Sequence, residues 1–118
     1  MNTLTVIAIS IVIVLHVLFL ILEMFLWDTP YGRKTFALSE DYAKQSAPLA
    51  ANQGLYNGFL ASGLLWGLTS TGGFDALIFF LCCIIIAGIY GAITAKRSIL
   101  WLQAFPALIA LTLLIINS

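Results

Sequence analysis

The sequence has little charge. Asp, Glu, Lys and Arg together make up 8% of its 118 residues, whereas hydrophobic residues make up 62%. A soluble domain carries about 25% charged residues, so this composition argues against an ordinary water-soluble domain. Five Lys and Arg balance five Asp and Glu, which leaves no net positive field to attract nucleic acid. The composition predicts an integral membrane protein with the lipid bilayer as its main partner.

Cysteine and histidine are scarce as well. The two cysteines, Cys82 and Cys83, are adjacent in an apolar run. Neighbouring cysteines rarely form a disulfide, and two are too few for a metal cluster. The single histidine, His16, does not complete the roughly four ligands of a structural metal site. We therefore expect no metal and no cofactor, and we expect the cysteines to be small buried residues.

Four apolar segments are each long enough to cross a bilayer. The bilayer core is about 30 Å thick, so a spanning helix needs about 20 mostly apolar residues. Only helices and closed barrels satisfy their backbone groups in lipid, and these runs are too long for barrel strands. We predict an all-α fold, an integral membrane four-helix bundle forming a single transmembrane domain over residues 1–118. The predicted spans are residues 3–27, 48–70, 74–95 and 98–116.

The residues between the spans support these boundaries. Residues 69–73 read Thr-Ser-Thr-Gly-Gly and predict a short turn, and residues 96–98 predict a tight hairpin. Pro48 suits the first turn of the second span. Ser39, followed by two acidic residues, predicts the cap of a short helix at the membrane surface, in the first loop. The first span follows no Lys or Arg and is too long for a signal core, so we expect a permanent helix.

The basic residues predict an orientation. Arg33, Lys34 and Lys44 lie in the first loop, and Lys96 and Arg97 lie in the third, whereas the second loop and both termini have none. Basic loops face the cytoplasm. We therefore expect a multi-pass protein whose N-terminus and C-terminus are both outside.

Polar residues from all four predicted spans fall at one depth. At about 1.5 Å per helical residue, Glu23 lies about 6 Å from the cytoplasmic end of the first span and His16 about 16 Å from it. They are seven residues apart, two turns, so they share a helix face. Unpaired polar groups in lipid cost several kcal/mol each, so this layer should line a pocket open to the cytoplasm. Besides Glu23, the layer comprises Asn52, Gln53, Tyr56, Asn57, Tyr90, Thr94 and Gln103.

Each polar residue has a functional and a structural interpretation. An ionisable residue inside a membrane is functional by default, and Glu23 suits proton exchange there; alternatively, Asn52 or Gln53 hydrogen-bonds it as a structural carboxyl. His16 suits a proton relay, an acid–base group or a ligand; alternatively, it hydrogen-bonds a neighbouring helix. If the protein is an enzyme or proton-coupled, His16 and Glu23 are the expected catalytic pair. The expected ligand-binding residues are Asn52, Gln53, Tyr56, Asn57, Tyr90 and Gln103.

Small residues at four-residue spacing predict close helix contacts. Gly54 and Gly58 form one such pair, and Gly88 with Ala92 forms another. In membranes this spacing lets helix backbones approach closely.

Several segments together carry a family resemblance. They are His16, Glu-Met-Phe at 23–25, Thr29-Pro30 with Gly32, and Ala-Asn-Gln-Gly-Leu-Tyr-Asn-Gly at 51–58. Over essentially its whole length the sequence resembles domain-of-unknown-function family 1304, a family of small bacterial membrane proteins. The resemblance implies a four-helix protein of the bacterial inner membrane and implies no assigned activity.

Three functions fit these observations. The first is a protein whose pocket binds a small amphiphilic or lipid-like molecule, with proton-coupled transport as one form of it. The second is a membrane-embedded enzyme, in which His16 and Glu23 shuttle protons on a lipid-like substrate as an isomerase does. The third is a structural or accessory subunit whose polar layer holds the helices together. Four short helices leave little room for a closed cavity, so we also expect a homo-oligomer.

Overall fold

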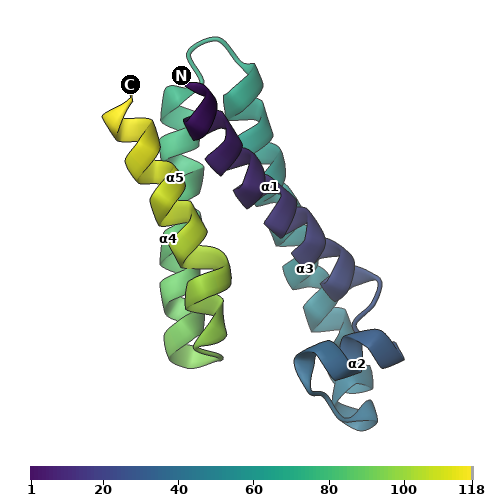
Figure 1. Cartoon of the computed structure of the whole chain (residues 1–118). Coiled ribbons are helices and arrows are strands. Elements are labelled where there is room, and N and C mark those ends of the chain that lie inside the picture. The colour runs from purple at the N-terminus through teal and green to yellow at the C-terminus, as the bar shows by residue number, and fades with distance from the viewer. Residues whose placement is uncertain (118) are drawn as a thin grey trace. The chain divides into compact units, whose positions relative to one another are not determined.

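The computed structural model describes residues 1–117, which are all-α as predicted. The chain divides into two compact units: the first joins Met1–Leu15 with the chain from Leu60 onward, and the second is His16–Phe59. Helices α1 and α3 contribute residues to both units. In chain order the elements are α1 (Thr3–Met24), α2 (Pro30–Phe36), α3 (Glu40–Thr69), α4 (Phe74–Thr94), η1 (Leu100–Ala104) and α5 (Phe105–Ile116) (Figure 1).

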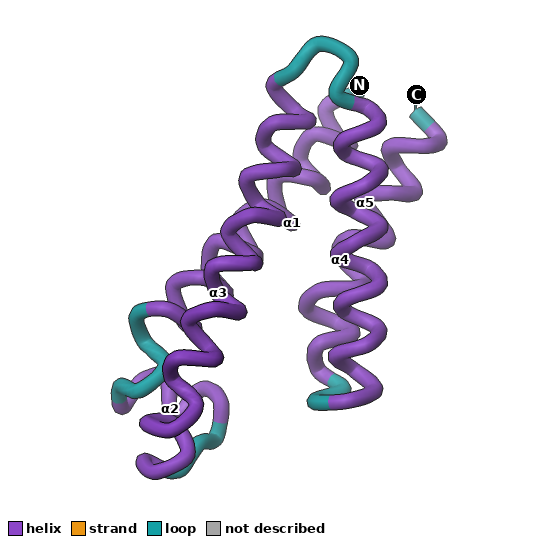
Figure 2. The backbone as a smooth tube through the Cα atoms, turned by 180° about the vertical axis from the view of Figure 1, so that it is seen from behind, coloured by secondary structure: helices purple, strands orange, loops and turns teal. Residues whose placement is uncertain are grey.

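Two helices within the described residues, α1 and α4, are long and apolar enough to cross a membrane. They have 22 and 21 residues, whereas the apolar stretch Leu100–Ile116 is shorter. With 30 residues α3 is the longest helix, but charges in its first turns and amides in its middle lower its hydropathy. Short loops join the helices (Figure 2).

All four long segments of the first unit share one apolar core. Side chains from the start of α1, the end of α3, α4 and α5 pack there, where dispersion and the hydrophobic effect favour contact. The fully or almost fully buried members are Ile9, Val12, Leu64, Leu77, Leu81, Ile84, Ala107, Ala110 and Leu114.

Glycines permit the closest helix contacts of the first unit. A Cβ at Gly88 would lie 2.7 Å from the backbone nitrogen of Ala104, so α4 and η1 touch through backbone atoms there. A Cβ at Gly63 would lie 2.4 Å from the ring of Phe80. The predicted close approach at Gly88 is confirmed.

Polar side chains tie the two ends of the chain together in the first unit. Asn2 caps α1, because its side-chain oxygen accepts from the Thr5 backbone N–H at 2.9 Å and from the Thr5 hydroxyl at 2.7 Å. Asn117, after α5, donates to the Thr5 hydroxyl at 3.4 Å. Thr5 is fully buried, so these bonds satisfy a hydroxyl that has lost water.

In the second unit, α1 and α3 pack through the predicted glycine pair. A Cβ at Gly54 would lie 2.7 Å from Met24 Cγ and 3.2 Å from the Leu20 carbonyl oxygen, and one at Gly58 would lie 2.6 Å from Leu20 Cδ1. Gly54 therefore permits a contact that a larger residue would obstruct, whereas at Gly58 only the flexible end of Leu20 lies close. The predicted close approach at this pair is confirmed.

The loop after α1 folds into a short helix with complete caps. The Thr29 hydroxyl donates to the Leu26 carbonyl at 2.6 Å and accepts from the Gly32 N–H at 3.2 Å, while Pro30 occupies the first helical turn. Ala37 ends α2 in the left-handed region, with φ of 54°. A Cβ at Gly32 would lie 1.8 Å from the Leu26 carbonyl oxygen, so the loop closes on itself only with glycine there.

The start of α3 differs from the prediction. Ser39 is a cap, since its hydroxyl accepts from the Tyr42 N–H at 3.1 Å, but the helix it begins is α3 itself. The expectation that Pro48 opens the second helix is wrong, because Pro48 lies inside α3. Proline inside a helix removes a ladder hydrogen bond, and its ring crowds the carbonyl four residues earlier, yet α3 runs from Glu40 through Pro48 to Thr69. The predicted short helix of the first loop exists as α2, not at Ser39.

The fourth predicted span begins with a π-helix, η1, which the sequence analysis did not anticipate. The Phe105 N–H bonds to the Leu100 carbonyl, one residue farther back than in an α-helix. Pro106 explains the change, because its ring would clash with the Leu102 carbonyl in a regular helix. The wider turn removes that clash and leads into α5.

Candidate functional site

The central contact of the second unit joins the end of α1 to the middle of α3. Asn57 donates from Nδ2 to Oε1 of Glu23 at 2.5 Å. Asn57 is 5% exposed, and Glu23 is half-buried. Without this bond the buried amide would lose its partner, so the bond orients both side chains.

The packing around Glu23 explains why Asn57 reaches it. Gly54 lies one turn before Asn57 and exposes no side chain, so the Cβ of Glu23 would lie 3.1 Å from a Cβ at that position. Residues three and four apart share a helix face. Gly54, Asn57 and Gly58 therefore present one small and polar stripe to α1.

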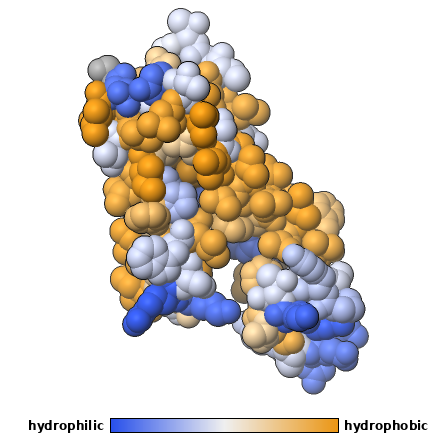
Figure 3. Space-filling view, in the orientation of Figure 1, coloured by the Kyte–Doolittle hydropathy of each residue, from blue (hydrophilic) through white to orange (hydrophobic). Residues whose placement is uncertain are grey.

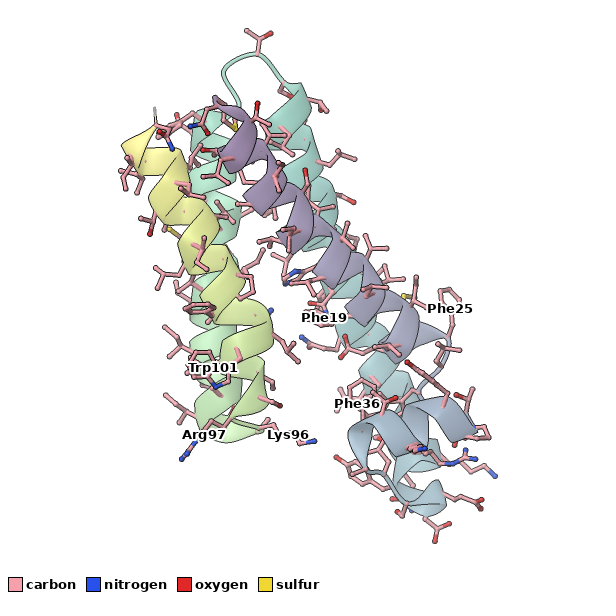
Figure 4. All side chains as sticks on the ribbon, in the orientation of Figure 1. Phe19, Phe25, Phe36, Lys96, Arg97 and Trp101 are labelled. Atoms are coloured by element: carbon pink, nitrogen blue, oxygen red, sulfur yellow. The ribbon has the colours of Figure 1, made fainter. Side chains whose placement is uncertain are left out.

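His16 and Phe19 lie on the same side of α1 as Glu23. The His16 ring is fully buried and meets the Phe19 ring edge-on, with centroids 5.2 Å apart. Phe19 precedes Glu23 by one turn, and it projects from α1 in that stretch (Figure 4). The end of α1 thus carries an imidazole, an aromatic ring and a carboxyl on successive turns.

The other predicted residues of α3 point in different directions around the helix from Asn57. Asn52 and Gln53 are exposed, and Tyr56 is 50% exposed with its ring 6.2 Å from that of Phe59. At about 100° per residue, Gln53 lies about 40° around the helix from Asn57, Tyr56 about 100° and Asn52 about 140°. Gln53 therefore flanks the site most closely, and Asn52 lies farthest from it.

Tyr90 and Gln103 belong to the first unit, on α4 and η1. Tyr90 is 69% exposed, and its carbonyl accepts from the Thr94 hydroxyl at 2.8 Å. That Tyr90 and Gln103 converge with Glu23 at one membrane depth stays a prediction.

The structure changes the expected hydrogen-bond partner of Glu23 and adds one residue, Phe19, to the site. The amide that bonds Glu23 is Asn57, not Asn52 or Gln53. The contribution of Phe19 was missed, although its spacing of three from His16 and four from Glu23 indicates a shared helix face.

The loop beside the site is held by Trp27. Its indole N–H donates to the Ser46 hydroxyl at 2.9 Å, and its ring lies 4.7 Å from that of Phe36. These contacts attach α2 to the first turns of α3. The loop that follows Glu23 is therefore an ordered part of the second unit.

Cys82 and Cys83 are free thiols in α4 and are partly buried. Among residues 1–117, no group of three or more His, Cys, Asp or Glu side chains is arranged to hold a metal ion.

Comparison with known proteins gives the family. Residues 10–115 match the family described as "Protein of unknown function (DUF1304)". The chain belongs to this family. It is also similar to the uncharacterized protein YpaA of Lactococcus lactis subsp. lactis (strain IL1403), with 26% identity over 113 residues that cover 92% of this chain and 95% of that protein. No solved structure matches the chain.

Membership of domain-of-unknown-function family 1304 confirms the resemblance seen in the sequence. The matched range contains every residue of the Glu23–Asn57 contact and its surroundings. The family description names no reaction, so any function has to be argued from the residues of the site.

Proposed function

We propose that this protein is a multi-pass protein of the bacterial inner membrane that binds a small amphiphilic or lipid-like molecule at the Glu23–Asn57 contact. One observation carries the proposal: a half-buried carboxyl at the end of an apolar helix is held by a buried amide. Ionisable groups at membrane depth are expensive and are usually functional.

Surface composition supports the membrane part of the proposal. Large apolar side chains along α1 are half exposed, including Ile7, Ile11, Val14 and Leu18. In the space-filling view the surface of α1 is largely hydrophobic, whereas hydrophilic surface gathers over α2 and the adjoining start of α3 (Figure 3). Burying this apolar surface in lipid contributes roughly 25 cal/mol per Å².

We propose four spans with both termini outside. Lys96 and Arg97 extend from the turn that joins α4 to η1 (Figure 4), and Arg33, Lys34 and Lys44 lie in or near α2 and the start of α3. All five basic residues thus lie in or beside the two connections that an alternating four-span path places on one side, and basic segments of this kind face the cytoplasm.

Cysteine labelling tests this orientation. In a background of Cys82→Ala and Cys83→Ala, a membrane-impermeant thiol reagent applied to intact cells should label Thr71→Cys, between α3 and α4. It should label Thr35→Cys, on α2, only after the membrane is opened. The reverse pattern, or equal labelling of both positions, would contradict the proposed orientation.

Ligand screening tests the binding function. Purified protein in lipid nanodiscs should be stabilised against thermal unfolding by at least one class of lipid, long-chain amine or sterol-like molecule. That stabilisation should disappear in Glu23→Gln and persist in the matched control Glu40→Gln, which changes an exposed carboxyl at the start of α3. If Glu23→Gln responds as the wild type does, Glu23 is a structural residue and the proposal fails.

A membrane-embedded enzyme is the second candidate, and the placement of His16 favours it. His16 is buried on the Glu23 side of α1, about 10 Å from Glu23 along the helix axis. A lipid-like substrate lying between them would have an acid–base group at each end. Conversion of a bound lipid-like compound by wild type but not by either Glu23→Gln or His16→Gln would identify this activity, and unchanged recovery of every bound compound would exclude it.

We also propose that the protein is a homo-oligomer, because a bundle of four short helices has little interior volume. Mass measurement in several mild detergents should give a multiple of the 12.8 kDa chain mass. A monomer in all of them would contradict this part of the proposal.

A further inference from the structure

The carboxyl of Glu23 has a hydrogen-bond donor but no charge partner. Its Oε1 accepts from Asn57, and within residues 1–117 its side chain forms no ion pair with a Lys or Arg. The ion pair that the same unit does contain joins Arg33 to Asp28 at 2.9 Å. The guanidinium of Arg33 is therefore already paired with the carboxylate of Asp28.

An uncompensated carboxylate away from water is costly, because an amide dipole replaces only part of its lost hydration. A cation that reaches Glu23 supplies the missing charge. Hydrogen bonds between a carboxylate and a charged donor are about twice as strong as neutral ones. The second carboxyl oxygen is the atom available to such a donor, since Oε1 already bonds to Asn57.

Phe19 adds a second feature that suits a cation. It lies four residues before Glu23, a spacing that brings side chains on a helix to about 5–6 Å between Cβ atoms. The edge-on contact with His16 at 5.2 Å orients the Phe19 ring. An ammonium head beside Glu23 can therefore contact this aromatic ring, which is worth roughly 0.5–1 kcal/mol or more when water is excluded.

We propose that the molecule bound at the Glu23–Asn57 contact is an organic cation, namely an amphiphile with an ammonium head and an apolar chain. The head lies on the free oxygen of Glu23 and against Phe19, while Asn57 holds the carboxyl in place. The apolar chain extends from the site into the surrounding lipid. This inference rests on the proposed binding function and names its ligand class.

Three probes with the same chain and different heads test the ligand class: decylammonium (protonated decylamine), decanol and decyl sulfate. Each is titrated into wild-type protein in phosphatidylcholine nanodiscs, and binding is measured by calorimetry against empty nanodiscs. Decylammonium should bind at least about tenfold more tightly than the other two, because it alone can donate a charged hydrogen bond to the carboxylate.

Two variants and one control test the residues. Glu23→Gln should weaken binding of the cation about tenfold or more, and Phe19→Leu, which keeps apolar volume, should weaken it about two- to fivefold. Glu40→Gln should leave it unchanged. A cation that binds Glu23→Gln as tightly as wild type is held elsewhere, which would overturn the inference.

The remaining outcomes separate this inference from the proposed function. If decanol or decyl sulfate binds as tightly as the cation and Glu23→Gln abolishes that binding, the cationic ligand is wrong and the amphiphile site stands. If none of the three probes binds the protein beyond empty nanodiscs, and the wider ligand screen also gives no stabilisation, both proposals fall.

Discussion

The glycine at position 54 allows a quantitative test of how α1 and α3 position the site. Gly54→Ala adds a methyl group whose carbon would lie 2.7 Å from Met24 Cγ, 3.1 Å from Glu23 Cβ and 3.2 Å from the Leu20 carbonyl oxygen. The last of these atoms belongs to the backbone, so α1 and α3 have to separate. Overpacking of this kind costs about 1–3 kcal/mol.

The same substitution also gains helix propensity, because alanine is about 0.8–1.0 kcal/mol better than glycine in a helix. The expected net loss in the free energy of unfolding is about 1 kcal/mol. Gly58→Ala is the matched control. It gains the same propensity, and its new methyl group would meet only Leu20, chiefly the flexible Cδ1 at 2.6 Å. We therefore expect Gly58→Ala to be neutral or slightly stabilising.

Unfolding of the purified protein by sodium dodecyl sulfate in mixed micelles measures both changes. In Gly54→Ala the nuclear magnetic resonance signals of the Asn57 side-chain amide should also shift, because separation of the helices lengthens its bond to Glu23. A Gly54→Ala protein that is as stable as Gly58→Ala, with unchanged Asn57 signals, would refute the argument that this close approach positions the carboxyl.

Three further substitutions test the loop and the π-helix. Trp27→Phe should lower the free energy of unfolding by about 1 kcal/mol, because it removes the hydrogen bond to Ser46. A double-mutant cycle with Ser46→Ala should show non-additive losses. Additive losses would mean that this hydrogen bond contributes nothing. Gly32→Ala should lower the free energy of unfolding by more than about 2 kcal/mol and increase proteolysis between α1 and α3, because its Cβ would lie 1.8 Å from the Leu26 carbonyl oxygen. Proteolysis as slow as in the wild type would contradict this packing of the loop. Pro106→Ala should restore regular α-helical hydrogen bonding before α5, visible as a slowly exchanging amide at residue 106, whereas fast exchange there would show that another contact causes the π-helix.

The amide cluster on α3 shows why the sequence did not single out the amide that bonds Glu23. Asn52, Gln53 and Asn57 are chemically equivalent candidates in the sequence. Helix periodicity separates their directions, but which direction faces α1 depends on the crossing at Gly54 and Gly58. The structure selects Asn57 because those two glycines bring that face of α3 against Leu20.

Ser39 and Pro48 show a second limit. The sequence contains both a helix cap and a proline suited to a helix start, and each is a valid local signal. Local signals do not say which of two possible starts is used when the residues between them are good helix formers. The structure uses the earlier one, and α3 includes the proline.

Composition and periodicity by themselves determined that the chain is helical, where its apolar segments lie, and that His16 and Glu23 share a side of α1, because these properties depend on local chemistry and on the helical repeat. Only the tertiary structure decided that Asn57 holds Glu23, that α2 folds back against Trp27, and that the π-helix η1 precedes α5. Each of these depends on contacts between residues far apart in the sequence or on backbone groups that a proline leaves without a partner. Such contacts form only after the helices pack.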